Sequence, residues 1–514
     1  MEFLKKIKLI QGGMGVYVSN WRLAKAVSQG NPGVTAGTIS GTGLDVVYVR
    51  LLQLGDPGGH VRRALTAFDT KFGCSIGQKI FKRYFVDGGK APGTKFKFSP
   101  MQVVHTGNEG DSIPAVSLPD VPISLNINPE TIELVIATAF AEVWLAKEGH
   151  QGNIFINLMK KVELPLIFAM YGAMLAGVDA IVVGAGNPDG LAAVCSKLAN
   201  HESVTFDLPV LYREAGETFQ CLFDPHLVAD NKLTSVPLNR PAFLAIVSQE
   251  NLVKALAQSE SEIPDGFIIE HHTAGGHNAG PQGPLKTDNL GQPLYSEMDE
   301  PDLKSILGVG IPFWLAGGYG SREKLTQAFQ AGAVGVQVGS TFALAEESGM
   351  KPVYRTAILN KLKTLTDDSE LVLTTLFSPT GFPFKVVQLE GTLSDNDVYS
   401  RRTRVCDIGL LQQRGINKSA EDGSRRLFQR CSAAPIEDFI KKRGLPHNAS
   451  DKRCLCNGLL ATVGLGQVVK TNGELLEEPA IITLGNHLDG IRRLSRQGQT
   501  TYWVLDVLAD ILGD

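Results

Sequence analysis

The stretch that decides the fold is residues 313–341, FWLAGGYGSREKLTQAFQAGAVGVQVGST. It holds two apolar, strand-like runs, at 313–316 and 335–339, with a helix-like segment between them. Gly317-Gly318 follows the first run, and the second ends in Gly339-Ser340. A strand, a helix and a second strand in this order are typical of a βαβ unit with parallel strands. We therefore predict a parallel sheet whose strand ends carry glycine-rich turns.

Outward from this unit, the alternation of strand-like and helix-like runs continues through most of the chain. Eight strand-like runs in about 340 residues match a (β/α)8 barrel, with an open doubly wound sheet as the structural alternative. The predicted strands span residues 7–11, 34–40, 154–159, 180–184, 243–248, 267–271, 313–316 and 335–339. The predicted fold class is therefore α/β, a TIM (β/α)8 barrel with insertions and an appended, mostly helical C-terminal region.

The same pattern divides the chain into two parts. Residues 1–394 are predicted to form the barrel, and the alternation stops in residues 395–514, where we expect mostly helices. Insertions are expected near residues 60–120 and 205–240. The first is polar and rich in Gly and Pro, which suggests a lid or an excursion over one barrel face. The second has the pattern of a hairpin.

Bulk composition limits the classes of partner. Lys and Arg total 49 and Asp and Glu 53, a net charge of −4, so no strong field favours nucleic acid or a membrane surface. The sequence shows no signal peptide and no membrane span, and its seven cysteines argue against a secreted disulfide framework. We expect a cytoplasmic protein that acts on a small-molecule substrate, with assembly into a homo-oligomer left open.

Glycine clusters follow several of the predicted strands. Glycines at the ends of the last two barrel strands commonly expose backbone N–H groups to a phosphate. Further clusters begin at Gly12, Gly184 and Gly275, and any one of them could be only a tight turn. Together they would surround one barrel mouth, where barrel active sites lie. The predicted phosphate site consists of Gly317, Gly318, Gly339 and Ser340.

One glycine pair precedes the best candidate for proton transfer. His277 follows Gly275-Gly276, and histidine is the side chain whose charge changes nearest neutral pH. The neighbouring His271 and His272 make a metal site the rival interpretation. Adjacent residues of a strand point to opposite faces, so both rings are not expected to reach one ion, and no metal site is predicted. A purely structural His277 stays open.

These motifs resemble the nitronate monooxygenase family and its relatives among the FMN-dependent enoyl-acyl-carrier-protein reductases. They occur in the family's order within residues 5–390. The matching pieces are Gln11-Gly12-Gly13-Met14, Asn157-Leu158-Met159, Gly184-Ala185-Gly186-Asn187-Pro188, Ala274-Gly275-Gly276-His277, Ala316-Gly317-Gly318 and Val338-Gly339-Ser340-Thr341-Phe342.

The resemblance implies non-covalent FMN in the barrel. It makes His277 a base or a polar anchor for the substrate, and it leaves Asn126 as a rival for the role of Asn157. Thr273 stands where the family usually has Glu, a departure that bears on the substrate more than on the cofactor. By resemblance, the residues around the flavin ring are Gly12, Gly13, Met14, Asn157, Gly184 and Gly276.

For the reaction, the resemblance implies oxidation of nitronates or nitroalkanes with O2. The alternative is an NAD(P)H-dependent FMN enoyl reductase that acts on an activated alkene. A third hypothesis makes the chain a flavoprotein subunit of a biosynthetic assembly, with residues 395–514 as its docking module.

The C-terminal region carries two further features. Four of its thiols could hold zinc or an iron–sulfur cluster, although simple buried thiols are the more common explanation. The basic run at 401–404 is expected to form a solvated face. The four cysteines are Cys406, Cys431, Cys454 and Cys456.

Overall fold

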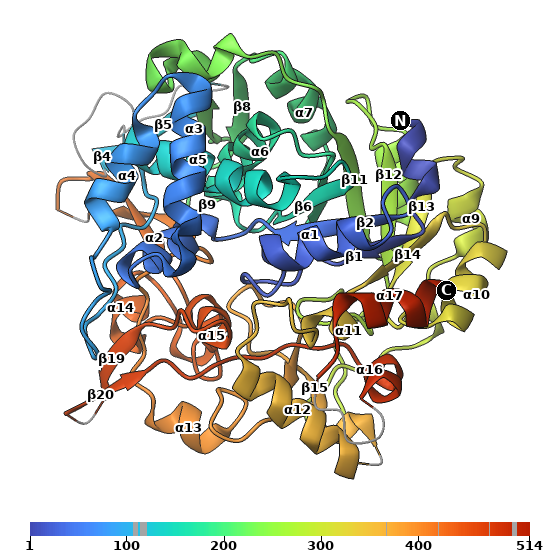
Figure 1. The fold of residues 1–514 in the computed structure, drawn as a ribbon. Coiled ribbons are helices and arrows are strands. Elements are labelled where there is room, and N and C mark those ends of the chain that lie inside the picture. The colour runs from blue at the N-terminus through green and yellow to red at the C-terminus, as the bar shows by residue number, and fades with distance from the viewer. Residues whose placement is uncertain are drawn as a thin grey trace.

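A closed barrel of eight parallel strands forms the centre of the molecule (Figure 1). The computed structural model describes residues 1–105, 112–113, 121–365, 367–419, 421–471, 473–495 and 501–513. The barrel strands are β1 (Leu9–Gln11), β2 (Thr35–Ser40), β6 (Asn153–Met159), β7 (Ala180–Gly184), β11 (Ala242–Val247), β12 (Gly266–Glu270), β13 (Phe313–Ala316) and β14 (Gly335–Val338). Neighbours pair in this order and β14 returns to β1, so the predicted barrel and all eight of its strands are confirmed.

Alternate residues of each strand face the barrel interior, where apolar side chains pack together. Phe155, Ile268 and Trp314 are fully buried there, and Trp314 Nε1 donates to the carbonyl of Ile7 at 2.8 Å. This packed core fills the barrel beneath the C-terminal ends of its strands, the end at which barrel active sites lie.

Helices surround the barrel on its outer side. Two of them, α5 and α6, are apolar on nearly every face because other layers of the chain cover them. The helices of the barrel are α1 (Trp21–Gly30), α2 (Leu44–Gln53), α5 (Pro129–Lys147), α6 (Glu163–Leu175), α7 (Leu191–Ala199), α8 (Glu250–Ala257), α9 (Leu303–Leu307), α10 (Arg322–Gln330), α11 (Ser340–Ala343) and α12 (Pro352–Thr364).

The first insertion is helical where the sequence predicted a polar excursion. It contains α3 (His60–Phe72) and α4 (Ile76–Tyr84), which pack with α5 (Figure 1). The buried residues Val61, Leu65, Phe68 and Phe72 recur at helical spacing, a signal that the surrounding polar residues obscured. These two helices lie outside the barrel, so the prediction of a lid is wrong for this part of the insertion. Residues 106–111 and 114–120 lie outside the described residues.

Two four-stranded sheets connect the insertions with each other and with the C-terminal region. One has the order β3-β5-β10-β8. The hairpin predicted at 208–223 is only partly right, because β10 pairs with β8, which precedes that range, while the predicted first arm forms β9 and pairs with β17. The other, β4-β18-β17-β9, joins both insertions to the C-terminal region. Their strands are β3 (Val103–His105), β4 (Ser112–Ile113), β5 (Ile123–Ile127), β8 (Val204–Asp207), β9 (Val210–Leu211), β10 (Phe219–Phe223), β17 (Gln413–Lys418) and β18 (Arg425–Arg430).

The C-terminal region contains helices, as predicted, together with strands, and it lies along one side of the barrel (Figure 1). Its last helix, α17, packs on α1 and α10, and Tyr502 Oη donates to the carbonyl of Thr341 at 2.6 Å. The division at residue 394 stays a prediction. Besides β17 and β18, the elements that follow α12 are β15 (Val372–Thr375), β16 (Phe384–Val387), α13 (Asn396–Arg401), α14 (Ile436–Lys441), α15 (Leu455–Thr462), β19 (Val468–Thr471), β20 (Glu474–Glu477), α16 (Asp489–Leu494) and α17 (Val504–Leu512).

Two arginines of the basic run at 401–404 are structural rather than solvated. The side chain of Arg402 is 2% exposed and donates from Nε to buried Glu478 at 2.7 Å. Arg404 donates to the carbonyl of Ala449 at 2.8 Å. The prediction of a solvated face is therefore wrong for these two residues. Within the described ranges, no helix combines the length and apolarity needed to cross a bilayer.

Candidate active site

A cavity of about 420 Å³ opens where the barrel strands end. Segments from β1, β6, β7, β12, β13 and β14 converge on it, so the glycine turns meet around one space, as their positions predicted. All eleven predicted site residues line this cavity, namely Gly12, Gly13, Met14, Asn157, Gly184, Gly276, His277, Gly317, Gly318, Gly339 and Ser340. Their roles in binding and catalysis stay predictions.

The turn after β1 is held flat against its neighbours. The Gly12 N–H donates to the carbonyl of Val338 at 2.8 Å. A Cβ atom on Gly13 would lie 2.3 Å from the Cβ of Asn157, so only glycine fits there. Gln11, the last residue of β1, stabilises the turn by donating from Nε2 to Ser19 Oγ at 2.8 Å. Because Gly12 and Gly13 have no side chains, this turn presents its backbone to the cavity.

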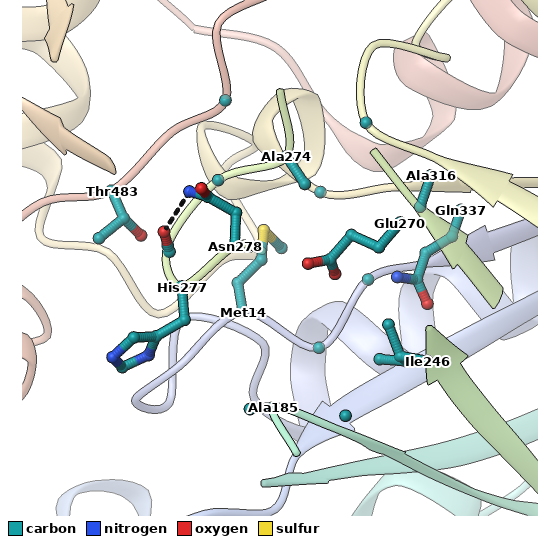
Figure 2. A pocket seen from close by; sticks show the side chains of 18 of the residues that line it. Met14, Ala185, Ile246, Glu270, Ala274, His277, Asn278, Ala316, Gln337 and Thr483 are labelled. Carbon is teal, nitrogen blue, oxygen red and sulfur yellow. Dashed lines mark hydrogen bonds between the residues drawn. The ribbon is translucent and has the colours of Figure 1, made fainter. Parts of the chain in front are cut away.

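Polar side chains form the innermost layer of the cavity. Asn157, Glu270 and Gln337 project from the inward positions of their strands, and Figure 2 shows Glu270 and Gln337 on one side of Met14. Gln337 Oε1 is buried without a hydrogen-bond partner in the described part of the chain. Flat glycine backbone beside a free amide oxygen fits a planar ring with polar edges, as in a flavin. Asn126 lies on β5 in an outer sheet, so it is not the rival of Asn157.

The predicted phosphate site is completed by a segment that the sequence did not indicate. Gly317 and Gly318 have φ of +91° and +84°, conformations that glycine adopts without strain. The Gly485 N–H donates to Ser340 Oγ at 2.7 Å, and a Cβ on Gly318 would lie 2.5 Å from the ring of His487. Residues 483–485 and 487 of the C-terminal region line the cavity as well. They fall where no motif was found, so no local signal pointed to them.

His277 lies on the opposite side of Met14 from Glu270 (Figure 2). Its Nε2 is 2.7 Å from Ser378 Oγ, and its ring meets Phe384 edge-on with centroids 4.7 Å apart. Burial, assisted by the nearby charge of Lys161, lowers the pKa of His277 to about 3. The imidazole is therefore neutral at physiological pH. A neutral ring with so low a pKa is a weak base and a good polar anchor.

Two ionisable groups that sequence reasoning did not assign face the same cavity. Lys161 Nζ is buried, lies 2.9 Å from the centroid of the Phe382 ring and has no hydrogen-bond partner among the described residues. Burial lowers the pKa of Lys161 to about 7. Burial also raises the pKa of Glu270 to about 7, against the opposing influence of Lys385 and Lys161. The position of Lys161 two residues after β6 was the available signal.

One group of side chains beside the cavity could hold a metal ion. Ligand atoms of His271, His272 and Glu300 lie within 4.8 Å of one another, and His271 Nε2 is 2.8 Å from Glu300 Oε1. The expectation that adjacent histidines point to opposite faces is wrong here, because β12 ends at Glu270 and the two rings lie in the following turn. Both nitrogens of His271 already have partners, since Nδ1 is 2.8 Å from Thr273 Oγ1.

Residues 238–381 match the family model described as nitronate monooxygenase. The matched segment contains the turns after β12, β13 and β14, including His277 and Gly339. The chain is a flavin-dependent oxidoreductase. The match confirms the resemblance that the sequence motifs indicated. No curated protein matches the chain.

Several solved structures are similar to the chain at low identity. FabK from Thermotoga maritima is 14% identical with a TM-score of 0.46, covering 99% of this chain and 93% of that one. Nitroalkane oxidase from Streptomyces ansochromogenes is 13% identical with a TM-score of 0.37, covering 75% and 79%. The enoyl reductase domain of MlnA from the macrolactin biosynthesis cluster of Bacillus amyloliquefaciens is 11% identical with a TM-score of 0.43, covering 98% and 93%.

Proposed function

We propose that this protein binds FMN and oxidises nitronates with O2. The observation that supports this proposal best is the buried ammonium group of Lys161 at the wall of the cavity. A buried charge without a partner is costly, so the site favours a ligand that brings a negative charge. A nitronate carries that charge on its two oxygens.

Several features of the cavity support FMN as the bound flavin. Gly12, Gly13 and Met14 offer backbone to the flat ring, and Gln337 Oε1 is free to accept a hydrogen bond from it. Bound FMN would supply the redox chemistry, while the protein positions and polarises the substrate. The phosphate is assigned to the turns after β13 and β14, with donors from Gly317, Gly318, Gly339 and Ser340.

The two side chains on the substrate side have different roles. Lys161 pairs with the oxyanion, and the bound negative charge raises its pKa so that it stays protonated. His277 hydrogen-bonds to the substrate as a neutral ring. Because the pKa of His277 is only about 3, it is too weak a base to deprotonate a nitroalkane efficiently. The preferred substrate is therefore the nitronate anion.

A second candidate is reduction of an alkene conjugated to a carbonyl, with NAD(P)H as the reductant. The pKa of Lys161, about 7, favours it, since a group with that pKa can donate a proton near neutral pH. In this reaction the same ammonium would stabilise the oxyanion that develops on the carbonyl oxygen.

Anaerobic mixing distinguishes the two reactions. The flavin absorbance of the holoprotein is followed after addition of propane-2-nitronate, NADH or NADPH. Bleaching by the nitronate alone is expected. Bleaching by a pyridine nucleotide, followed by reoxidation with an enoyl thioester, would establish the reductase instead. A flavin-loaded protein that responds to none of these compounds would contradict both candidates.

A further inference from the structure

The C-terminal region brings two cysteines, Cys406 and Cys431, into direct contact. Cys431 directly follows β18, and residues 406–412 lead into the partner strand β17. The Gln412 N–H donates to the carbonyl of Gly409 at 3.2 Å, so this segment turns back on itself. The turn brings Cys406 beside the end of β18, where its sulfur accepts a hydrogen bond from the Cys431 thiol.

Hydrogen bonds hold the two segments against each other. Two residues before the first thiol, Arg404 donates from Nη1 to the carbonyls of Ser432 and Ala434, both at 3.4 Å, next to the second thiol. One residue after the first thiol, Asp407 accepts from the fully buried guanidinium of Arg50 at 3.2 Å. These bonds keep the two sulfurs close to each other without a covalent link.

The two thiols have unequal chemical properties. Cys406 Sγ accepts from the Cys431 thiol and also from Gln412 Nε2, which lies 3.7 Å away. The two donors, led by the Cys431 thiol, hold the pKa of Cys406 below its ordinary value. The same contact, together with burial, raises the pKa of Cys431 well above its ordinary value. Cys406, which is partly exposed, is therefore the nucleophile of the pair.

The two other thiols of the cluster, Cys454 and Cys456, differ from this pair. Burial raises the pKa of Cys454 to about 12 and that of Cys456 well above its ordinary value, so neither is a nucleophile near neutral pH. Among the described residues, the only three ligand atoms within 4.8 Å of one another belong to His271, His272 and Glu300. No three of the thiols are that close, so the cluster offers a reactive pair rather than the ligand set of a metal ion.

We propose that hydrogen peroxide oxidises Cys406 and Cys431 to a disulfide, which a dithiol reductant reverses. The Cys406 thiolate attacks one oxygen of the peroxide, the O–O bond breaks, and hydroxide departs from the sulfenic acid that forms on the sulfur. The Cys431 sulfur then attacks that sulfur, the S–S bond forms and the S–O bond breaks. The thiol protons leave with the oxygens, so two thiols are oxidised while one peroxide is reduced to two molecules of water.

This disulfide would lie beside the loop that holds His277. Pro379 lines the small cavity, about 10 Å³ in volume, that the thiols surround. On either side of Pro379, the hydroxyls of Ser378 and Thr380 lie 2.7 and 3.3 Å from His277 Nε2. The small cavity shares no lining residue with the flavin cavity, and the proposal does not depend on the reaction proposed above.

The test counts thiols in the full-length protein, which is reduced with dithiothreitol, freed of it and mixed with a small excess of hydrogen peroxide. About two of the seven thiols should be lost, and dithiothreitol should restore them. Peptide mapping without reduction should show the Cys406 and Cys431 peptides linked, with the mass of two hydrogens missing. An unchanged thiol count, a disulfide between other cysteines, or oxidation of Cys406 without a disulfide would overturn the proposal.

Variants assign the roles of the two thiols. Cys406→Ser should lose no thiol to peroxide. Cys431→Ser should form no disulfide and should keep a sulfenic acid on Cys406 that dimedone labels, because the second thiol is gone. Cys456→Ser removes another thiol of the same cluster and is the matched control, which should form the disulfide as the wild-type protein does. Retained flavin reports that each variant has folded, and a disulfide in Cys431→Ser would contradict the assignment.

Discussion

The barrel mouth and the C-terminal region that covers it are built from different parts of the chain. The mouth is mostly backbone, with glycines such as Gly13 and Gly318 in close contact with their neighbours. The C-terminal region is held by buried side-chain pairs, such as Arg425 with Glu217 and Arg402 with Glu478. A substitution at the mouth therefore adds atoms where there is no room for them, whereas one in the C-terminal region removes a partner from a buried pair. The two kinds of change should therefore be distinguishable by experiment.

The largest effect on flavin binding is expected from Gly13→Ala. The new Cβ would lie 2.3 Å from the Cβ of Asn157, an atom that is fixed to the backbone of β6. Overpacking of this kind costs about 1–3 kcal/mol and displaces the turn from the flavin ring. We expect the purified variant to hold less than about a tenth of the flavin of the wild-type protein, measured by absorbance.

The control for this variant is Gly308→Ala at the end of α9. Gly308 is exposed, and a Cβ there meets only ordinary contacts at 3.4 Å or more. It should retain its flavin. Full flavin content in Gly13→Ala would show that the mouth is more deformable than its contacts indicate.

The residues of the barrel mouth could be predicted from the sequence, whereas those that the C-terminal region contributes to the cavity could not. Gly12, Gly317 and Gly339 each follow a strand directly, so a local pattern predicted where they meet. Gly485 and His487 reach the cavity only through long-range packing of the C-terminal region, which no local pattern encodes. Lys161 was missed because its role depends on burial beneath Phe382, more than two hundred residues away in sequence. The barrel was therefore predictable and its cover was not.

The largest effect on stability is expected from Glu217→Gln. Glu217 and Arg425 form a two-pronged pair at 2.7 and 2.6 Å, with side chains only 1% and 2% exposed. Removing one charge from such a pair leaves the other buried and costs about 3–5 kcal/mol. Urea unfolding should report this loss in the free energy of unfolding.

A neighbouring exposed pair provides the comparison for Glu217→Gln. Lys418 and Glu214 lie 3.5 Å apart with side chains 61% and 60% exposed. Lys418→Ala should change stability by less than about 1 kcal/mol, because water screens the pair. Equal effects of the two variants would show that the buried pair does not anchor the C-terminal region.

A smaller effect is expected in the pH dependence of nitronate oxidation. The pKa of Lys161 is about 7, so its charge is present below that pH and is lost above it. Glu270, whose pKa is also about 7, becomes negative over the same range and acts in the same direction. Lys385, with a pKa of about 8, loses its charge slightly higher, while His277, at about 3, stays neutral throughout. The kcat/KM for propane-2-nitronate should fall up to about tenfold per pH unit above 7.

Two variants test the cause of that fall. Lys161→Met should lower kcat/KM and flatten the profile between pH 6.5 and 9. Lys160→Met is the matched control, since this neighbouring lysine is partly buried but does not line the cavity. A wild-type profile that rises with pH, or an unchanged profile in Lys161→Met, would exclude Lys161 as the anion partner.

The smallest effect is expected where the C-terminal region meets the predicted phosphate site. His487 packs against Gly318, and burial holds its pKa below the usual value. If its ring donates to the phosphate, His487→Ala should weaken FMN by about tenfold, the loss of one charge-assisted hydrogen bond, and leave riboflavin binding unchanged. His447→Ala, at an exposed position of the same region, should affect neither ligand. Fluorescence titration measures the affinity for both flavins. Equal weakening of FMN and riboflavin binding would mean that His487 only packs against the turn. The barrel mouth would then bind the phosphate through its own backbone.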